Sequence, residues 1–135
     1  MNMNCQYVPS SRAGYVSHIV GKWHLGFCNK DYWPQSRGFD SHYGFLLGAQ
    51  TYFDHSRDAG YDFRDNAEVA WEANGTYSTF LIQERAKKII RYPGFMCLLI
   101  SQTDFREHDQ ESPLFLYVPF QAVHGPLEVP EIVLL

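Results

Sequence analysis

The sequence of 135 residues lacks any apolar run of the length, about 18 residues, that a membrane-spanning helix needs. Residues 1–6 contain neither a basic region nor an apolar stretch, so we expect no signal peptide in this chain. Basic residues are not in excess, because 11 Lys and Arg stand against 15 Asp and Glu, for a net charge of -4. This balance gives no electrostatic reason to expect a nucleic-acid or anionic-membrane partner.

Cysteine is scarce, and several common motifs are missing. Cys5, Cys28 and Cys97 cannot all pair within one chain and are not spaced as metal ligands, which excludes a disulfide scaffold. The histidines show no zinc-binding spacing, and the aspartates form no calcium-binding loop. The sequence also has no phosphate-binding loop, no dinucleotide-binding glycine pattern and no G-x-S-x-G nucleophile elbow.

The sequence does contain enough apolar material for a core, since 45% of its residues are hydrophobic and 16% aromatic. Residues 14–21, rich in β-branched side chains and bounded by glycines, predict a strand. Residues 78–91 place apolar side chains on one stripe and predict an amphipathic helix. Residues 114–118 form a continuous apolar run that predicts a central strand buried on both faces, whereas 34–60 shows no period and is predicted to be irregular. This order indicates an α/β fold.

Two features indicate that the chain is part of something larger. It ends on the apolar run 129–135 without a polar tail, whereas complete domains usually place polar segments at their ends. Residues 95–111 make the link from helix to strand far longer than the roughly 2–6 residues usual in α/β units. We interpret 95–111 as an extra strand or as an insertion into the native fold.

The candidates for chemistry follow the two predicted strands. Lys22 and His24 lie two positions apart after 14–21, so an extended backbone projects both on the same side. A fixed positive charge beside a group that titrates near neutrality suits a phosphate or sulfate group undergoing transfer. His124 follows the strand 114–118 and can act as an acid or base. On spacing alone, a non-catalytic interpretation is more common than a functional site: Lys22 would be a surface lysine, and the histidines would only make hydrogen bonds.

Asn74 begins an Asn-Gly-Thr glycosylation sequon just before the predicted helix. Such triplets arise often by chance, so this one gives mild support for a protein of the secretory pathway.

The residues around Lys22 also carry a family resemblance. Residues 14–26 resemble the second signature of the sulfatases, and four further motifs agree with that family in order. These are Arg37-Gly38-Phe39-Asp40, Tyr77-Ser78-Thr79, Pro113-Leu114-Phe115-Leu116-Tyr117 and Gln121-Ala122-Val123-His124. The sequence is most similar to the arylsulfatase B group, over 13–93 and 112–131. The first motif is long and specific, and the others are persuasive together.

The resemblance implies part of an alkaline-phosphatase-like α/β sandwich, with a mixed central sheet flanked by helices, over residues 13–135. It implies hydrolysis of the sulfate esters of sulfated glycans or aryl sulfates, through a formylglycine nucleophile and a calcium ion, in a lysosomal or secreted protein. By the same resemblance Lys22 contacts sulfate and the nucleophile, His24 accepts a proton as sulfate leaves, and His124 binds sulfate and assists the leaving oxygen. Positive groups and a metal stabilise the charge that develops on sulfuryl oxygens.

The sequence also departs from the family pattern. Cys5 stands too far from the following proline, and too close to Gly14, to be the formylglycine precursor, and residues 1–12 do not match the family. The family's Asp-Asp pair, its later Asp-Asn pair and its second sulfate-binding lysine are missing, so we expect the calcium ligands to lie outside this chain. We therefore expect the isolated chain to be inactive. A second hypothesis is a catalytically dead sulfatase-like module that acts by binding.

Overall fold

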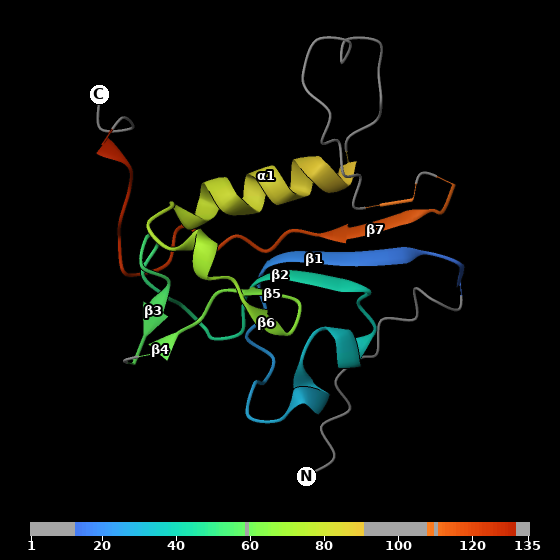
Figure 1. Ribbon diagram of the computed structural model, residues 1–135, viewed down its shortest axis with the longest axis horizontal. Coiled ribbons are helices and arrows are strands. Elements are labelled where there is room, and N and C mark those ends of the chain that lie inside the picture. Colours follow the sequence, from blue (N-terminus) through green and yellow to red (C-terminus); the bar gives the residue numbers. More distant parts are fainter. Residues whose placement is uncertain (1–12, 59, 91–107, 110, 132–135) are drawn as a thin grey trace.

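The centre of the structure is a mixed five-stranded β-sheet (Figure 1). The computed structural model describes residues 13–58, 60–90, 108–109 and 111–131. The strand order is β6-β5-β2-β1-β7. The strands β7, β1 and β2 run parallel, whereas β5 is antiparallel to β2 and β6 is antiparallel to β5. The strands are β1 (Val16–Lys22), β2 (Ser41–Phe45), β5 (Arg64–Asp65), β6 (Glu68–Val69) and β7 (Leu114–Tyr117).

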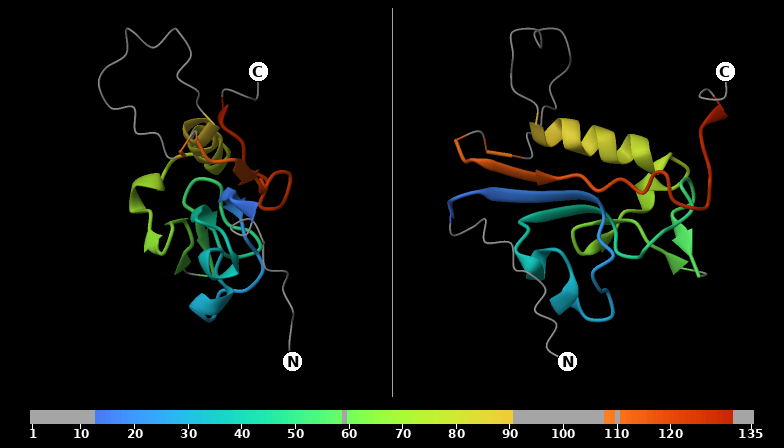
Figure 2. Two further views of the ribbon diagram at one scale, coloured as in Figure 1. Left: turned by 90° about the vertical axis from the view of Figure 1, so that its right-hand side faces the viewer. Right: turned by 180° about the vertical axis from the view of Figure 1, so that it is seen from behind.

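Short elements and one longer helix surround this sheet. The hairpin of β3 (Ser56–Arg57) and β4 (Gly60–Tyr61) lies near the carboxyl ends of the parallel strands, on the left of Figure 1. The helix α1 (Ser78–Ile90) lies along one face of the sheet, as Figure 2 also shows. The 3-10 helices are η2 (Lys30–Tyr32), η3 (Gln35–Arg37) and η4 (Trp71–Ala73).

Apolar side chains pack on both faces of the sheet. On the α1 face, Ile82 and Ile89 are each 1% exposed and pack with Val20 and Phe45 from the sheet. The opposite face carries a second cluster, formed by Ile19, Trp23, Phe39 and Leu46. Burial on both faces is the arrangement expected of an α/β domain, and the predicted α/β class with a mixed sheet is confirmed.

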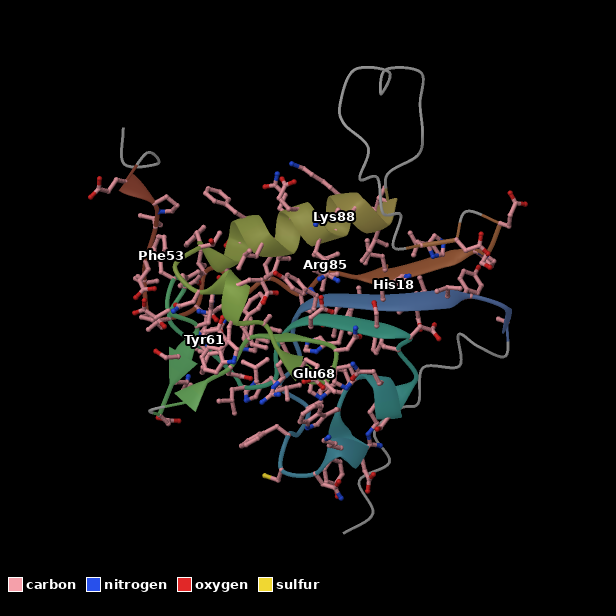
Figure 3. All side chains as sticks on the ribbon, in the orientation of Figure 1. His18, Phe53, Tyr61, Glu68, Arg85 and Lys88 are labelled. Atoms are coloured by element: carbon pink, nitrogen blue, oxygen red, sulfur yellow. The ribbon has the colours of Figure 1, made fainter. Side chains whose placement is uncertain are left out.

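The helix predicted over 78–91 is confirmed and ends at Ile90. Ile90, the last residue of α1, is 55% exposed although it is apolar, so the buried stripe stops at Ile89. Arg85 extends from α1 toward the sheet, where its guanidinium lies 4.0 Å from the Tyr43 ring centroid and forms an ion pair with Asp65 (Figure 3). This contact ties the helix to the antiparallel part of the sheet.

The strand β1 confirms the strand predicted over 14–21, with a start two residues later and an end one residue later. The prediction of irregular structure over 34–60 is wrong for 41–45, which form the central strand β2. Burial on both faces explains the error, because four of the five β2 residues are buried and no alternation of polar and apolar residues remains.

The strand β7 lies where we predicted a strand, but the prediction of burial on both faces is wrong. It pairs with β1 on one side and has no second partner strand among the described residues. Phe115 and Tyr117 are 42% and 48% exposed, and both pack only against Phe39 among the described aromatic rings. An apolar run shows that a strand is hydrophobic, but it does not show how many strands pair with it or whether both of its faces are covered.

No helix in the described ranges is long and apolar enough to cross a membrane. Cys5 lies outside the described residues, and so does 95–111 apart from residues 108, 109 and 111. The predicted boundaries of the sulfatase-like part, 13–135, and of the insertion therefore stay predictions.

Candidate functional site

The carboxyl ends of β7, β1 and β2 meet at one edge of the sheet, and the backbone beyond them is joined by hydrogen bonds. The Lys22 N–H donates to the Pro119 carbonyl oxygen at 2.8 Å, on the β7 side. The N–H groups of the next two residues donate to the Phe45 and Leu46 carbonyl oxygens at 2.9 and 3.1 Å, on the β2 side. Segments that follow parallel strands commonly carry binding and catalytic residues, and here they form one connected edge.

Trp23 anchors the segment that carries Lys22 and His24. Its side chain is 7% exposed, its indole N–H donates to the Tyr32 carbonyl oxygen at 2.8 Å, and its ring packs edge-on against Phe39. Lys22 is half-buried and His24 is exposed. Because Trp23 turns into the interior, its two polar neighbours stay at the surface of the edge.

His24 adopts a backbone conformation that is unusual for a histidine. Its φ is 52°, in the left-handed region, and such strain persists only where the surroundings hold it. The imidazole lies against Gly48, where an added Cβ would stand 2.6 Å from the ring Nε2 and 2.7 Å from Cε1. Glycine at position 48 is therefore what allows the ring this position.

His124 lies in the segment that follows β7, and its side chain is exposed. Its ring Nδ1 lies 2.8 Å from the Gly125 carbonyl oxygen and donates to it, which leaves Nε2 as the ring nitrogen that this contact does not use. Its backbone N–H donates to the Gln121 carbonyl oxygen, and its carbonyl oxygen accepts the Tyr52 hydroxyl at 3.0 Å. The backbone of His124 is thus held by hydrogen bonds while its side chain is exposed.

Lys22, His24 and the segment of His124 therefore come to the same edge of the sheet, as their positions after β1 and β7 predict. No hydrogen bond or ion pair joins their three side chains within the described part of the chain. The segment after β2 lies between them, since Gly48 contacts His24 and Tyr52 holds His124. The role of this segment after β2 was not predictable from the sequence, because 34–60 has no regular pattern.

Four other histidines are buried and serve the fold, namely His18, His42, His55 and His108. Burial lowers the pKa values of His18 and His55, and it lowers the pKa of His42 to about 4. The His55 Nε2 donates to the Ala73 carbonyl oxygen at 2.9 Å and its ring packs on Phe63. The rings of His18, His42 and His55 are neutral at physiological pH and lie in the interior.

His18 and His108 form a hydrogen-bonded pair. The His108 Nε2 lies 3.1 Å from the Ser112 carbonyl oxygen and must donate to it, which leaves its Nδ1 to accept from the His18 Nε2 at 3.3 Å. The His18 Nδ1 then accepts from the Ser41 hydroxyl at 2.7 Å. His108 belongs to the predicted insertion 95–111 and is 5% exposed, so this end of the segment packs on β1.

Asn74 is exposed in the turn after η4 and before α1. The described residues contain no group of three or more His, Cys, Asp or Glu side chains that could hold a metal ion. Cys28, the one cysteine in the described ranges, is exposed and unpaired.

Comparison with known proteins assigns the family. The Sulfatase family model matches residues 10–133, which is most of the chain. The chain belongs to the sulfatase family. The resemblance read from residues 14–26 is thereby confirmed.

Individual sulfatases support the assignment. The chain is 42% identical over 123 residues to mouse Arylsulfatase J, covering 87% of this chain and 18% of that protein. It is 31% identical over 125 residues to mouse N-acetylgalactosamine-6-sulfatase, covering 86% and 21%, and 27% identical over 126 residues to a Klebsiella aerogenes arylsulfatase, covering 88% and 24%. The sulfatase chain thus spans less than a quarter of the length of these relatives.

Solved structures agree in fold. The structure of Ps i-CgsB in complex with k-i-k-neocarrahexaose superposes with a TM-score of 0.65 at 22% identity, covering 90% of this chain and 27% of that chain. The predicted alkaline-phosphatase-like fold, of which this sulfatase chain is a part, is confirmed.

Proposed function

We propose that this sulfatase chain supplies three polar groups, Lys22, His24 and His124, to a site that hydrolyses sulfate esters in the complete protein. The observation that carries the proposal is the edge where the segments after β1, β2 and β7 are joined by hydrogen bonds. Two of the three groups, Lys22 and His24, lie within the signature over 14–26, and the third reaches the same edge from the neighbouring strand.

The three groups suit the charge changes of sulfuryl transfer. The Lys22 ammonium makes no ion pair with any described residue, so its charge is available to a sulfate oxygen. The His24 ring is exposed and rests on Gly48, where it can accept a proton as sulfate departs. With Nδ1 donating to the Gly125 carbonyl oxygen, a second proton on Nε2 would let the His124 ring donate to a sulfate oxygen or to the leaving oxygen.

Calcium and formylglycine belong to the proposed chemistry of the complete protein, where a metal and an activated nucleophile supply charge stabilisation and covalent catalysis. The described residues do not fit either group, because they contain no cluster of metal-ligating side chains and Cys28 lies in no C-x-P-S-R motif. We therefore assign no residue of this chain to them.

Sulfated glycans or aryl sulfates are the proposed substrate class, and a lysosomal or secreted location is the proposed compartment. The names of the relatives, which include an N-acetylgalactosamine-6-sulfatase and arylsulfatases, support the substrate class. Exposure of Asn74 in a turn supports glycosylation there. Expression in a secretory host should give a glycosylated chain, and Asn74→Gln should remove the added mass.

Binding of inorganic sulfate tests the proposed site in the chain itself. We expect titration of sulfate into the histidine-labelled chain to shift the NMR signals of His24 and His124 along one saturation curve. Lys22→Met should weaken binding by about tenfold or more, because a hydrogen bond to a charged group is lost. The matched control is Lys88→Met, which removes the same charge from the exposed side of α1 (Figure 3).

Equal weakening by the two lysine variants, or the absence of a saturable shift, would contradict the proposal. The isolated chain should not hydrolyse an aryl sulfate such as p-nitrophenyl sulfate. In the complete protein, hydrolysis that survives Lys22→Met would contradict the role of Lys22, whereas saturable sulfate binding without any hydrolysis would favour the second hypothesis, a catalytically dead module that acts by binding.

A further inference from the structure

The support loop, which we define as residues 46–50 directly after β2, contacts His24 at one end and, at the other, Gln121 in the segment that carries His124. The Leu46 carbonyl oxygen accepts the His24 N–H at 3.1 Å. Gly48 lies directly beneath the His24 imidazole. The loop thus contacts both the backbone and the ring of His24.

The other end of the support loop is fixed to the segment that carries His124. The Gln50 N–H donates to the Gln121 side-chain oxygen at 3.1 Å, and the Gln121 side-chain nitrogen donates to the Gln50 carbonyl oxygen at 2.7 Å. Both glutamines are nearly inaccessible, at 1% and 4% exposure. A reciprocal pair of this kind is strong because neither partner can turn to water when one bond breaks.

Asp62 fastens the beginning of the support loop. The Leu46 N–H donates to both carboxylate oxygens, at 3.2 Å to Oδ1 and 3.1 Å to Oδ2. The Leu47 N–H donates to Oδ2 at 2.8 Å. Asp62 is 6% exposed, and the Arg64 guanidinium lies 4.0 Å away. A buried carboxylate that receives two backbone N–H groups makes charge-assisted bonds, and Asp62→Asn would lose that charge and replace one of the two oxygens near the Leu46 N–H with an NH2 group.

We infer that Asp62 and Gln121 are positioning residues, which hold the support loop so that His24 and His124 keep a fixed relation to each other. Neither side chain is part of the proposed hydrolytic group. The inference rests on the proposed function, because positioning matters only if His24 and His124 act together. The coupling between the support loop and the two rings can nevertheless be measured without any substrate. Positioning of this kind matters because small displacements of a reacting group cost large factors in rate or affinity.

Histidine ring NMR signals of the full chain, recorded at one pH without sulfate, test the inference. We expect Asp62→Asn to shift the signals of both His24 and His124, although the substituted side chain contacts neither ring. The matched control is Asp58→Asn, because the Asp58 side chain is 88% exposed and pairs only with Arg57 among the described residues. This control should leave both signals in place.

The His18 signal reports whether the fold survives, since His18 lies in β1 away from the support loop. With that signal retained, unchanged His24 and His124 signals in Asp62→Asn overturn the inference. If Asp62→Asn loses the His18 signal, Gln121→Met decides, because it removes two hydrogen bonds without removing a buried charge. It must then shift His124 and, through the support loop, His24; a shift of His124 alone overturns the coupling.

Sulfate affinity separates this inference from the proposed function. We expect Asp62→Asn to weaken the apparent affinity for inorganic sulfate by about tenfold while the control variant leaves it unchanged. If the parent chain binds no sulfate, the proposed function fails. The effect of Asp62→Asn on the His24 and His124 ring signals still tests the positioning inference in that case. If the parent chain binds sulfate but Asp62→Asn leaves the His24 and His124 ring signals unchanged, only the positioning inference fails.

Discussion

His42 makes the free energy of unfolding of this chain depend on pH. Its side chain lies in the middle of β2, is 1% exposed, and places Nε2 3.4 Å from the Gly21 carbonyl oxygen. The ring Nδ1 is buried and has no hydrogen-bond partner among the described residues. Burial, with a smaller contribution from the charge of Arg64, lowers the pKa of His42 from 6.5 to about 4. Protonation would place a charge and an unsatisfied N–H in the interior.

The sign and size of the effect follow from proton linkage. In the unfolded chain His42 takes up a proton near its ordinary pKa, whereas in the folded chain it does so only near pH 4. The unfolded state therefore binds more protons between these values, and the stability held by neutral His42 is lost as the pH falls. From about pH 7.5 to about pH 5 the expected loss is about 2 kcal/mol. Burial also lowers the pKa values of His18 and His55, which act in the same direction.

Urea unfolding at these two pH values measures the effect. His42→Gln keeps an amide that can donate to the Gly21 carbonyl oxygen but cannot titrate, so its pH-dependent loss should be about 2 kcal/mol smaller than that of the parent. His124→Gln, the matched control, replaces an exposed histidine and should lose as much stability as the parent. An equal loss in His42→Gln and the parent would refute this reasoning.

Three further substitutions test the packing that forms the edge. Gly21→Ala would place a Cβ 2.2 Å from a backbone carbonyl oxygen and should cost about 3 kcal/mol or more in urea unfolding, whereas Gly60→Ala meets only an ordinary 3.6 Å contact and should cost far less. Ile82→Ala should cost about 2–4 kcal/mol by the same assay, while Ile90→Ala, at a 55% exposed position on the same helix, should cost little. Trp23→Phe removes the indole hydrogen bond and should cost about 1–2 kcal/mol; an unchanged unfolding midpoint would contradict that role.

Features that depend on the local order of residues along the chain were predictable before the structure was known. The apolar spacing over 78–91 required a helix with one buried face, and α1 buries Ile82 and Ile89. The β-branched run over 14–21 required a strand, and Lys22 and His24 follow it at the sheet edge. The long motif over 14–26 also sufficed to identify the family.

Features that depend on neighbours distant in sequence became visible in the folded chain. The strand β2 has no periodic pattern because both of its faces are buried, and the apolar run of β7 does not record that one side lacks a strand partner among the described residues. Asp62 and Gln121 look like ordinary polar residues in the sequence, yet each is buried with its hydrogen bonds directed at the support loop. Burial and hydrogen-bond partners arise when segments meet in space, so the order of residues along the chain does not contain them.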